Sequence, residues 1–202
     1  METLAQPTKK TRRTFPELVY ERWGGVTYYR KGYSDVLKNL KTPAEIMGAS
    51  GFRSFVVSYL SAAVFSQMDH KTFRTLTNEP GLHIGRNENL ACDVMLYEKS
   101  VLTNEKITTK YVDIPPLIAV EVDVKVDLKN KTEHAYVFGK TQKLMDFGAT
   151  KVIWVLTDIR QVLVFDAASP EATYRDWHSA IEVVPGVSFN IGQYLADEGF
   201  TN

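Results

Sequence analysis

The chain has 202 residues, which fits one domain, and a domain of this size buries roughly 70% of the surface that its unfolded form exposes. Its hydrophobic content of 44% is that of a globular protein and excludes a disordered tail. The 24 basic and 24 acidic residues cancel, which argues against a protein that coats nucleic acid through broad electrostatics alone. The single cysteine, Cys92, excludes an internal disulfide and a cysteine-rich zinc site.

The N-terminal segment 1–14 is polar and has no apolar core of the kind that a signal peptide requires. We therefore expect a loose basic arm over residues 1–14, followed by one folded domain over residues 15–202. No stretch approaches the roughly 18 apolar residues that cross a bilayer, so the sequence predicts a cytoplasmic protein without a membrane partner.

Helical spacing of apolar residues and capping signals predict several helices in chain order. A short helix is expected over 33–40, and Thr42-Pro43-Ala44-Glu45 has the pattern of a capping box at a helix start. A longer helix over 52–69 follows helical spacing, and a strong helix over 132–147 is closed by Gly148.

From residue 72 onward, the pattern changes to the two-residue period of strands. Asp158-Ile159-Arg160 has the composition of a hairpin turn between two of them. The order of elements predicts an α/β (α+β) fold, a mixed β-sheet flanked by helices. The strands are expected over 73–78, 90–98, 115–125, 151–157 and 161–166, with a further pair near 181–191.

The segment PLIAVEVDVKVDL alternates between an apolar face and a face that becomes charged halfway along. Glu121, Asp123 and Lys125 share this second face, because side chains two apart in a strand point the same way. A strand whose alternating charges simply face water would explain the pattern equally well. The opposite face is expected to carry Ile118, Val120, Val122, Val124, Val126 and Leu128.

The segment NLACDVMLYE favours a site over a solvated strand, because Asp93 is one carboxylate in a predicted strand that is otherwise apolar and suited to burial. An isolated buried carboxylate is costly and requires a partner or a proton. If this strand pairs with the charged strand, Asp93 lies beside Glu121 and Asp123. Carboxylates this close repel each other, and a hard cation such as Mg²⁺ or Mn²⁺ relieves the repulsion.

Two lysines could complete a hydrolytic site at this place. Lys125 shares the charged face, where its ammonium would orient a nucleophile or stabilise charge on a phosphate. Lys140 and Lys143 lie on one face of the 132–147 helix. That face is either a solvated surface or directs Lys140 to the metal site or to a backbone phosphate.

With these residues in place, the chain resembles the PD-(D/E)XK nuclease superfamily, and within it the large bacterial family of predicted restriction endonucleases. The resemblance spans about residues 15–166. It is carried by ELVYERWGGVTYYRKG, ACDVMLYE, PPLIAVEVDVK and KTQKLMDFGATKVIWVL. It implies a restriction-endonuclease-like fold, with Asp93 as the acid of the first motif and Glu121 as that of the second.

The sequence departs from the superfamily pattern at two points. Asp123 stands two residues after Glu121, where a lysine is expected, and Ala91-Cys92 replaces the proline of the first motif. Either Asp123 and Lys125 form the acid–lysine pair, or Glu121 is the acid and Lys140 of the helix supplies the charge. Some members place a catalytic glutamate on an early helix, a role open to Glu45 as an alternative to capping.

The resemblance implies a metal-dependent endonuclease that hydrolyses DNA phosphodiester bonds and is able to act as a homodimer. Its metal ligands would be Asp93, Glu121 and Asp123, and its catalytic residues would be these three with Lys125 and Lys140. The alternative is a nuclease-like fold that binds nucleic acid or protein without catalysis.

Overall fold

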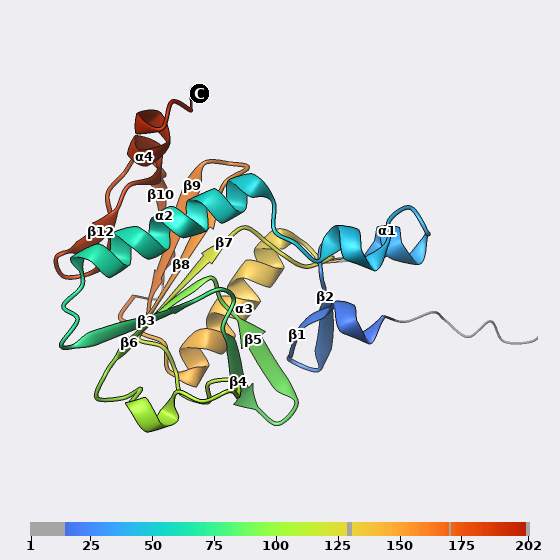
Figure 1. Ribbon diagram of the computed structural model, residues 1–202, viewed down its shortest axis with the longest axis horizontal. Coiled ribbons are helices and arrows are strands. Elements are labelled where there is room, and N and C mark those ends of the chain that lie inside the picture. The colour runs from blue at the N-terminus through green and yellow to red at the C-terminus, as the bar shows by residue number, and fades with distance from the viewer. Residues whose placement is uncertain (1–14, 129–130, 170, 201–202) are drawn as a thin grey trace, which may run out of the picture.

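The computed structural model describes residues 15–128, 131–169 and 171–200, so the arm expected over residues 1–14 lies outside the described residues. A six-stranded mixed sheet forms the centre (Figure 1). Strands β7 and β8 are parallel, and the other neighbouring pairs are antiparallel. The expected α/β (α+β) fold is confirmed. In spatial order the strands are β10 (Thr173–Asp176), β9 (Gln161–Asp166), β8 (Lys151–Leu156), β7 (Ile118–Val122), β6 (Val94–Glu98) and β3 (Phe73–Thr77).

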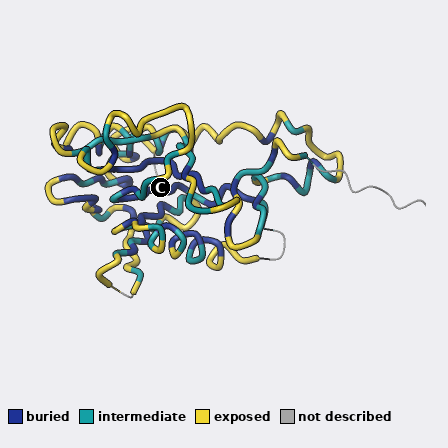
Figure 2. The backbone as a smooth tube through the Cα atoms, turned by 90° about the horizontal axis from the view of Figure 1, so that it is seen from below, coloured by how far each residue is buried: buried dark blue, intermediate teal, exposed yellow. Residues whose placement is uncertain are grey.

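Two helices cover opposite faces of this sheet. The helix α2 (Gly51–Gln67) buries Val56, Leu60 and Val64 against one face, together with the hairpin β11 (Ile181–Val184) and β12 (Val187–Phe189). On the other face lies α3 (Glu133–Phe147), which connects the parallel strands β7 and β8. Buried segments run through the middle of the molecule, between exposed outer turns (Figure 2). The last helix among the described residues is α4 (Ile191–Asp197).

A second, four-stranded sheet packs on the α3 side of the molecule. Its aromatic residues Trp23 and Tyr28 stack on each other and contact the ring of Tyr136 in α3. A small cluster of Leu18 and Tyr33 with neighbouring apolar residues joins the short N-terminal elements. The sheet has the order β2 (Val26–Tyr29), β1 (Val19–Trp23), β5 (Glu88–Ala91) and β4 (Gly81–Gly85). The short helices are η1 (Pro16–Leu18), α1 (Tyr33–Leu37), η2 (Pro43–Ile46) and η3 (Asn104–Lys106).

The capping signals act as the sequence predicts. The Thr132 side chain accepts a hydrogen bond from the Ala135 N–H at 3.1 Å, and Gly148 ends α3 with φ +126°. Thr42 and Glu45 form the expected capping box. The element that follows it is a short 3₁₀ helix and not an α-helix. Capping therefore accounts for Glu45. Within the described ranges, no helix is long and apolar enough to span a bilayer.

Two predicted strands change sheets midway, which corrects the expected face assignments. The strand predicted over 90–98 is interrupted at Cys92 and Asp93, so β5 belongs to the small sheet and β6 to the large one. The strand predicted over 115–125 ends at Val122, because Asp123 has φ +56°, and the chain beyond it passes to the edge of the small sheet, where Val126 forms an isolated bridge with Arg30 next to β2. Beyond Asp123, the next apolar side chains lie in the core on the α3 side, opposite to Ile118, Val120 and Val122. The reversed residues are Val124 and Val126.

Candidate active site

The two points where strands change sheets lie next to each other and hold the predicted acids. The backbone N–H of Asp93 donates to the Val120 carbonyl at 3.2 Å, which places the aspartate beside the end of β7. Glu121 is in β7, and Lys125 lies three residues beyond the end of that strand. Asp93, Glu121, Lys125 and Lys140 are all buried, and they form one network of ion pairs.

Asp93 is held by three donors around its carboxylate. Its Oδ2 accepts from the Val122 N–H at 2.8 Å and lies 2.8 Å from the Lys125 Nζ, while its Oδ1 accepts from Arg53 Nη2 at 2.6 Å. Burial opposes ionisation, but Lys125 and Arg53 outweigh it and lower the pKa of Asp93. The carboxylate is therefore an anion whose charge two cations balance.

Glu121 is fully buried and contacts a lysine through each oxygen. Its Oε2 accepts from the Lys125 Nζ at 2.5 Å, and its Oε1 lies 2.5 Å from the Lys140 Nζ. The Oε1 contact lacks hydrogen-bond geometry, and this oxygen has no other hydrogen-bond partner in the described part of the chain. Burial lowers the pKa of Lys125, but Glu121 and Asp93 outweigh it, so the pKa is raised and the side chain is an ammonium.

Lys140 belongs to this network, so its side chain points into the candidate site and does not lie on a solvated helix surface. The side chain is 1% exposed, and its Nζ contacts Glu21 Oε1 at 2.5 Å and donates to the Ala91 carbonyl at 2.6 Å. Burial opposes the charge, but the two glutamates raise the pKa of Lys140 well above its usual value. Lys143, one turn further on, instead forms a half-exposed ion pair with Glu88 at 3.1 Å.

Glu21 is a member of the site that sequence reasoning did not find. The Tyr136 hydroxyl donates to its Oε2 at 2.6 Å, the Trp23 Nε1 donates to the same oxygen at 3.1 Å, and the Ala91 N–H donates to Oε1 at 3.2 Å. Burial, and next the charge of Glu21, raise the pKa of Tyr136. The signal was present in the segment VYERW, where one acid lies among apolar and aromatic residues, as Asp93 does in its own strand.

Asp123 does not join the other acids, which corrects the expected grouping of three carboxylates on one face. Its oxygens accept hydrogen bonds from the Thr157 N–H at 2.7 Å and from the Thr157 hydroxyl at 2.8 Å. The positive φ at Asp123 turns its side chain away from the line of β7 and toward the turn between β8 and β9. Among the described residues, no group of three or more His, Cys, Asp or Glu side chains is arranged to hold a metal ion.

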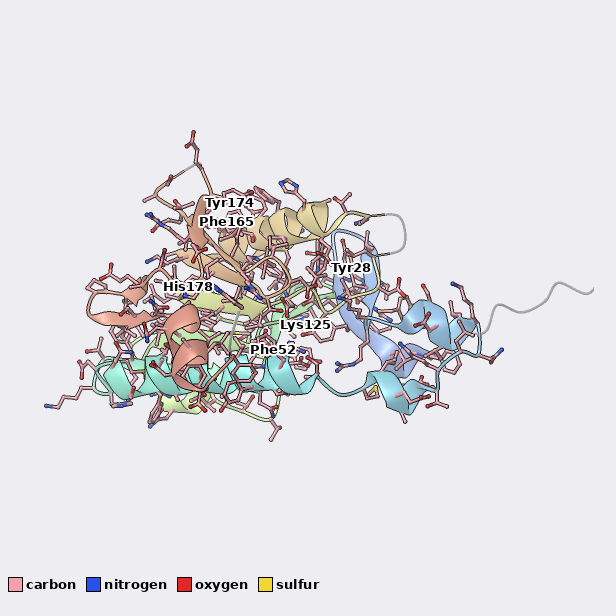
Figure 3. The ribbon with its side chains drawn as sticks, turned by 90° about the horizontal axis from the view of Figure 1, so that it is seen from above. Tyr28, Phe52, Lys125, Phe165, Tyr174 and His178 are labelled. Carbon is pink, nitrogen blue, oxygen red and sulfur yellow. The ribbon has the colours of Figure 1, made fainter. Side chains whose placement is uncertain are left out.

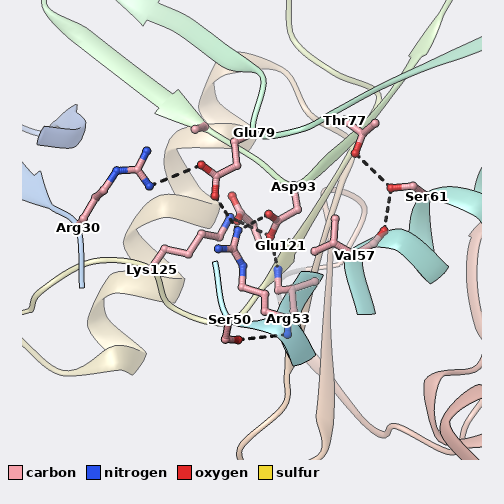
Figure 4. A network of polar contacts seen from close by, with 12 residues as sticks. Arg30, Ser50, Arg53, Val57, Ser61, Thr77, Glu79, Asp93, Glu121 and Lys125 are labelled. Atoms are coloured by element: carbon pink, nitrogen blue, oxygen red, sulfur yellow. Dashed lines mark hydrogen bonds and ion pairs between the residues drawn. The ribbon is translucent and has the colours of Figure 1, made fainter. Parts of the chain in front are cut away.

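A second chain of charges, which sequence patterns did not predict, extends from Asp93 toward the surface. Arg53 Nη2 also contacts Glu79 Oε1 at 2.8 Å, and Arg30 Nη1 lies 3.8 Å from Glu79 Oε2 (Figure 4). Arg53 comes from the first turn of α2, and Arg30 follows β2. These contacts join the N-terminal elements to the large sheet through the candidate site.

A cavity of about 460 Å³ opens beside the network. Lys125, Arg30, Arg53 and Asp123 line it, whereas Lys140 lies deeper and does not. A molecule in this cavity would therefore meet Lys125 before the other lysine. The cavity connects the candidate site to the exterior.

Comparison with known proteins gives a likeness of fold. No family model matches the chain. No curated protein matches its sequence either. A crystal structure of a candidate nuclease belonging to DUF820 from Anabaena variabilis ATCC 29413 superposes with a TM-score of 0.64 at 12% sequence identity. The match covers 92% of this chain and 94% of the other, so the two proteins share one fold over nearly their whole lengths.

Proposed function

We propose that this protein is a metal-dependent endonuclease of the PD-(D/E)XK type that hydrolyses DNA phosphodiester bonds with Mg²⁺ or Mn²⁺. The observation that carries the proposal is that Asp93, which directly precedes β6, and Glu121 of the neighbouring strand β7 both contact the Nζ of Lys125. The shared fold with a candidate nuclease is consistent with it. Two buried acids beside a lysine that lines a cavity are groups that phosphodiester hydrolysis requires.

The donor set fits a hard divalent cation. The Lys125 ammonium lies 2.8 Å from Asp93 Oδ2 and 2.5 Å from Glu121 Oε2, so a positive charge is already accommodated between two carboxylate oxygens. The Oε1 of Glu121 lies 2.5 Å from the Lys140 Nζ without hydrogen-bond geometry, so both oxygens of this carboxylate already face a positive charge. Mg²⁺ commonly uses only one or two protein carboxylates and completes its coordination with water and substrate phosphate.

Each residue of the network then has a distinct part. Asp93 and Glu121 would hold the metal, which when bound supplies a water of lowered pKa and neutralises charge on the phosphate. Lys125 lines the cavity, so it would orient the attacking water and contact the phosphate. Lys140 is too deep for this and would position Glu121 through their ion pair. Asp123 would position the β8–β9 turn through Thr157.

The test is cleavage of plasmid DNA and of single-stranded DNA in Mg²⁺ or Mn²⁺ by the wild type and by Asp93→Asn. The wild type should cut, and the variant should lose at least two orders of magnitude in rate, because the amide ligates a hard cation poorly. Asp35→Asn is the matched control, since Asp35 forms an exposed ion pair with Lys41 at 3.1 Å outside the cavity. Circular dichroism checks that both variants fold. Absence of cleavage by the wild type, or equal cleavage by both variants, contradicts the proposal.

A non-catalytic nucleic-acid-binding module is the second candidate, and the charge balance of the site favours it. Asp93 and Glu121 are already neutralised by Lys125, Lys140 and Arg53, so these carboxylates have cationic partners within the protein itself. Calorimetric titration with Mn²⁺ separates the candidates. An endonuclease binds the ion through Asp93, whereas a module of this kind gives no heat that depends on that residue.

A further inference from the structure

The cavity beside the candidate site is lined by residues of different chemistry. Its basic lining residues include Arg30, Lys31 and Arg53. The Lys31 N–H donates to the Lys125 carbonyl at 2.8 Å, which ties this segment to the site. Arg30 and Arg53 are held in place by ion pairs with Glu79, and Arg53 also by Asp93. Positioned guanidinium groups that line a cavity are suited to bind a phosphate group.

The lining also includes apolar residues, and one of them is aromatic. Phe52, in the first turn of α2, is 37% exposed and lines the cavity, as does Ile159 of the β8–β9 turn, which is 58% exposed. Phe52 and Lys125 lie near one another in the view of Figure 3. The rings of Phe52 and Phe200 make an edge-to-face contact with centroids 5.8 Å apart. An exposed aromatic ring in a cavity that also holds arginines is a platform on which a nucleobase stacks.

The dimensions and charges of the cavity restrict what enters it. Its volume of about 460 Å³ is that of a small-molecule pocket and suits one nucleotide. A cavity of this size has no room for a base-paired duplex, so an unpaired nucleotide is the part of a nucleic acid that fits it. Asp158 and Glu133 also line the cavity and repel phosphate, whereas Arg30 and Arg53 attract it.

From this geometry we infer that the cavity binds one unpaired nucleotide of the substrate, with its base on Phe52 and its phosphate on Arg30 and Arg53. The inference rests on the proposed function and specifies it, because it makes single-stranded or unpaired nucleic acid the preferred substrate. The zero net charge agrees with this assignment, since recognition comes from one pocket and requires no broad basic face.

Fluorescence anisotropy with a labelled single-stranded oligonucleotide and with the matching duplex tests the inference in EDTA, without any divalent metal. The wild type should bind the single strand more tightly than the duplex. Phe52→Ala should weaken single-strand binding about tenfold through loss of stacking, and Phe52→Trp should restore it. Phe65→Ala is the matched control, because Phe65 is an exposed phenylalanine of the same helix that contacts His70 outside the cavity. It should bind like the wild type.

The binding and cleavage assays test the nucleotide pocket and the endonuclease proposal separately. Equal binding of single strand and duplex, or equal affinities of Phe52→Ala and Phe65→Ala, overturns the inference even if the wild type cuts plasmid DNA. Phe52-dependent binding of single strands by a protein that cleaves neither form in Mn²⁺ supports the pocket and defeats the endonuclease. An Arg30→Gln variant should bind single strands with a shallower salt dependence, by about 0.7 in logarithmic slope for one lost phosphate contact. An unchanged slope contradicts the phosphate subsite.

Discussion

The Asp93 side chain accepts a hydrogen bond from the backbone N–H of Val122 at 2.8 Å, so the first acid of the site is fastened to the strand that carries the second. This bond joins the two points at which the chain passes between sheets. It fixes the carboxylate before any ligand arrives. Substitution of Asp93 should therefore affect the stability of the fold as well as the proposed cleavage.

Asp93→Asn should lower the free energy of unfolding by about 3 kcal/mol, because it removes the charge that Lys125 and Arg53 share inside the protein. The amide oxygen can still accept from Val122, so the fold should persist. Urea unfolding followed by circular dichroism measures the change. A loss below about 1 kcal/mol would show that the two cations lie in water, contrary to their burial.

The stability that Asp93 contributes should depend on pH. Its pKa is lowered in the folded protein, so the contribution is complete above the unfolded value of about 3.9 and is lost as pH falls through the folded value. The difference in unfolding free energy between the wild type and Asp93→Asn should therefore shrink below about pH 4. Urea unfolding at a series of pH values measures it. A difference that grows toward acid pH would contradict this sign.

Lys140→Met should be strongly destabilising, by about 3–5 kcal/mol, because it leaves Glu21 and Glu121 buried without their shared cation. Glu21→Gln combined with Lys140→Met should cost less than the sum of the two single changes. The double-mutant cycle isolates this coupling. Strict additivity would mean that the 2.5 Å contact between Lys140 and Glu21 contributes no net stability.

At position 123, the backbone and the side chain can be separated by substitution. Asp123→Gly tolerates φ +56° but loses both bonds to Thr157, whereas Asp123→Val loses the bonds and is also strained at positive φ. The valine variant should be less stable than the glycine variant by at least about 1 kcal/mol. Thermal unfolding measures the order. The reverse order would show that the positive φ at residue 123 causes no backbone strain in the valine variant.

Lys125→Met should bind Mn²⁺ more tightly than the wild type, because its ammonium lies between the two carboxylates that the ion would contact. The same variant should lose cleavage, since the group that faces the cavity is gone. Calorimetry and the plasmid assay together check this. Weaker Mn²⁺ binding by the variant would place the ion elsewhere.

Much of the fold could be predicted from periodicity and capping. The helices α2 and α3 and the strands β3, β8 and β9 lie within two residues of their predicted bounds. The short strands β1, β2, β4 and β10 and the helix α4 were missed, since segments of four to seven residues give too few periods to detect.

The site could be predicted in its members more than in its geometry. A lone acid in an apolar strand identified Asp93, and its expected pairing with the strand of Glu121 is confirmed. Alternation assumes an unbroken extended backbone, so it could not foresee the left-handed residue at Asp123 that reverses the faces beyond it. Glu21 was not predicted as a site residue because its strand was not predicted. Arg53 was not predicted because its contact with Asp93 depends on tertiary packing alone.

The passage of two strands from one sheet to the other has a consequence for how the molecule can vary. The hairpins at the far ends of both sheets can lengthen or shorten without displacing the acids, because the acids are anchored at the crossing itself. A change in the tilt of one sheet against the other, in contrast, would pull Glu21 away from Lys140 and Asp93 away from Val122 together. Slow hydrogen exchange at the Val122 amide should therefore report on the integrity of the whole centre.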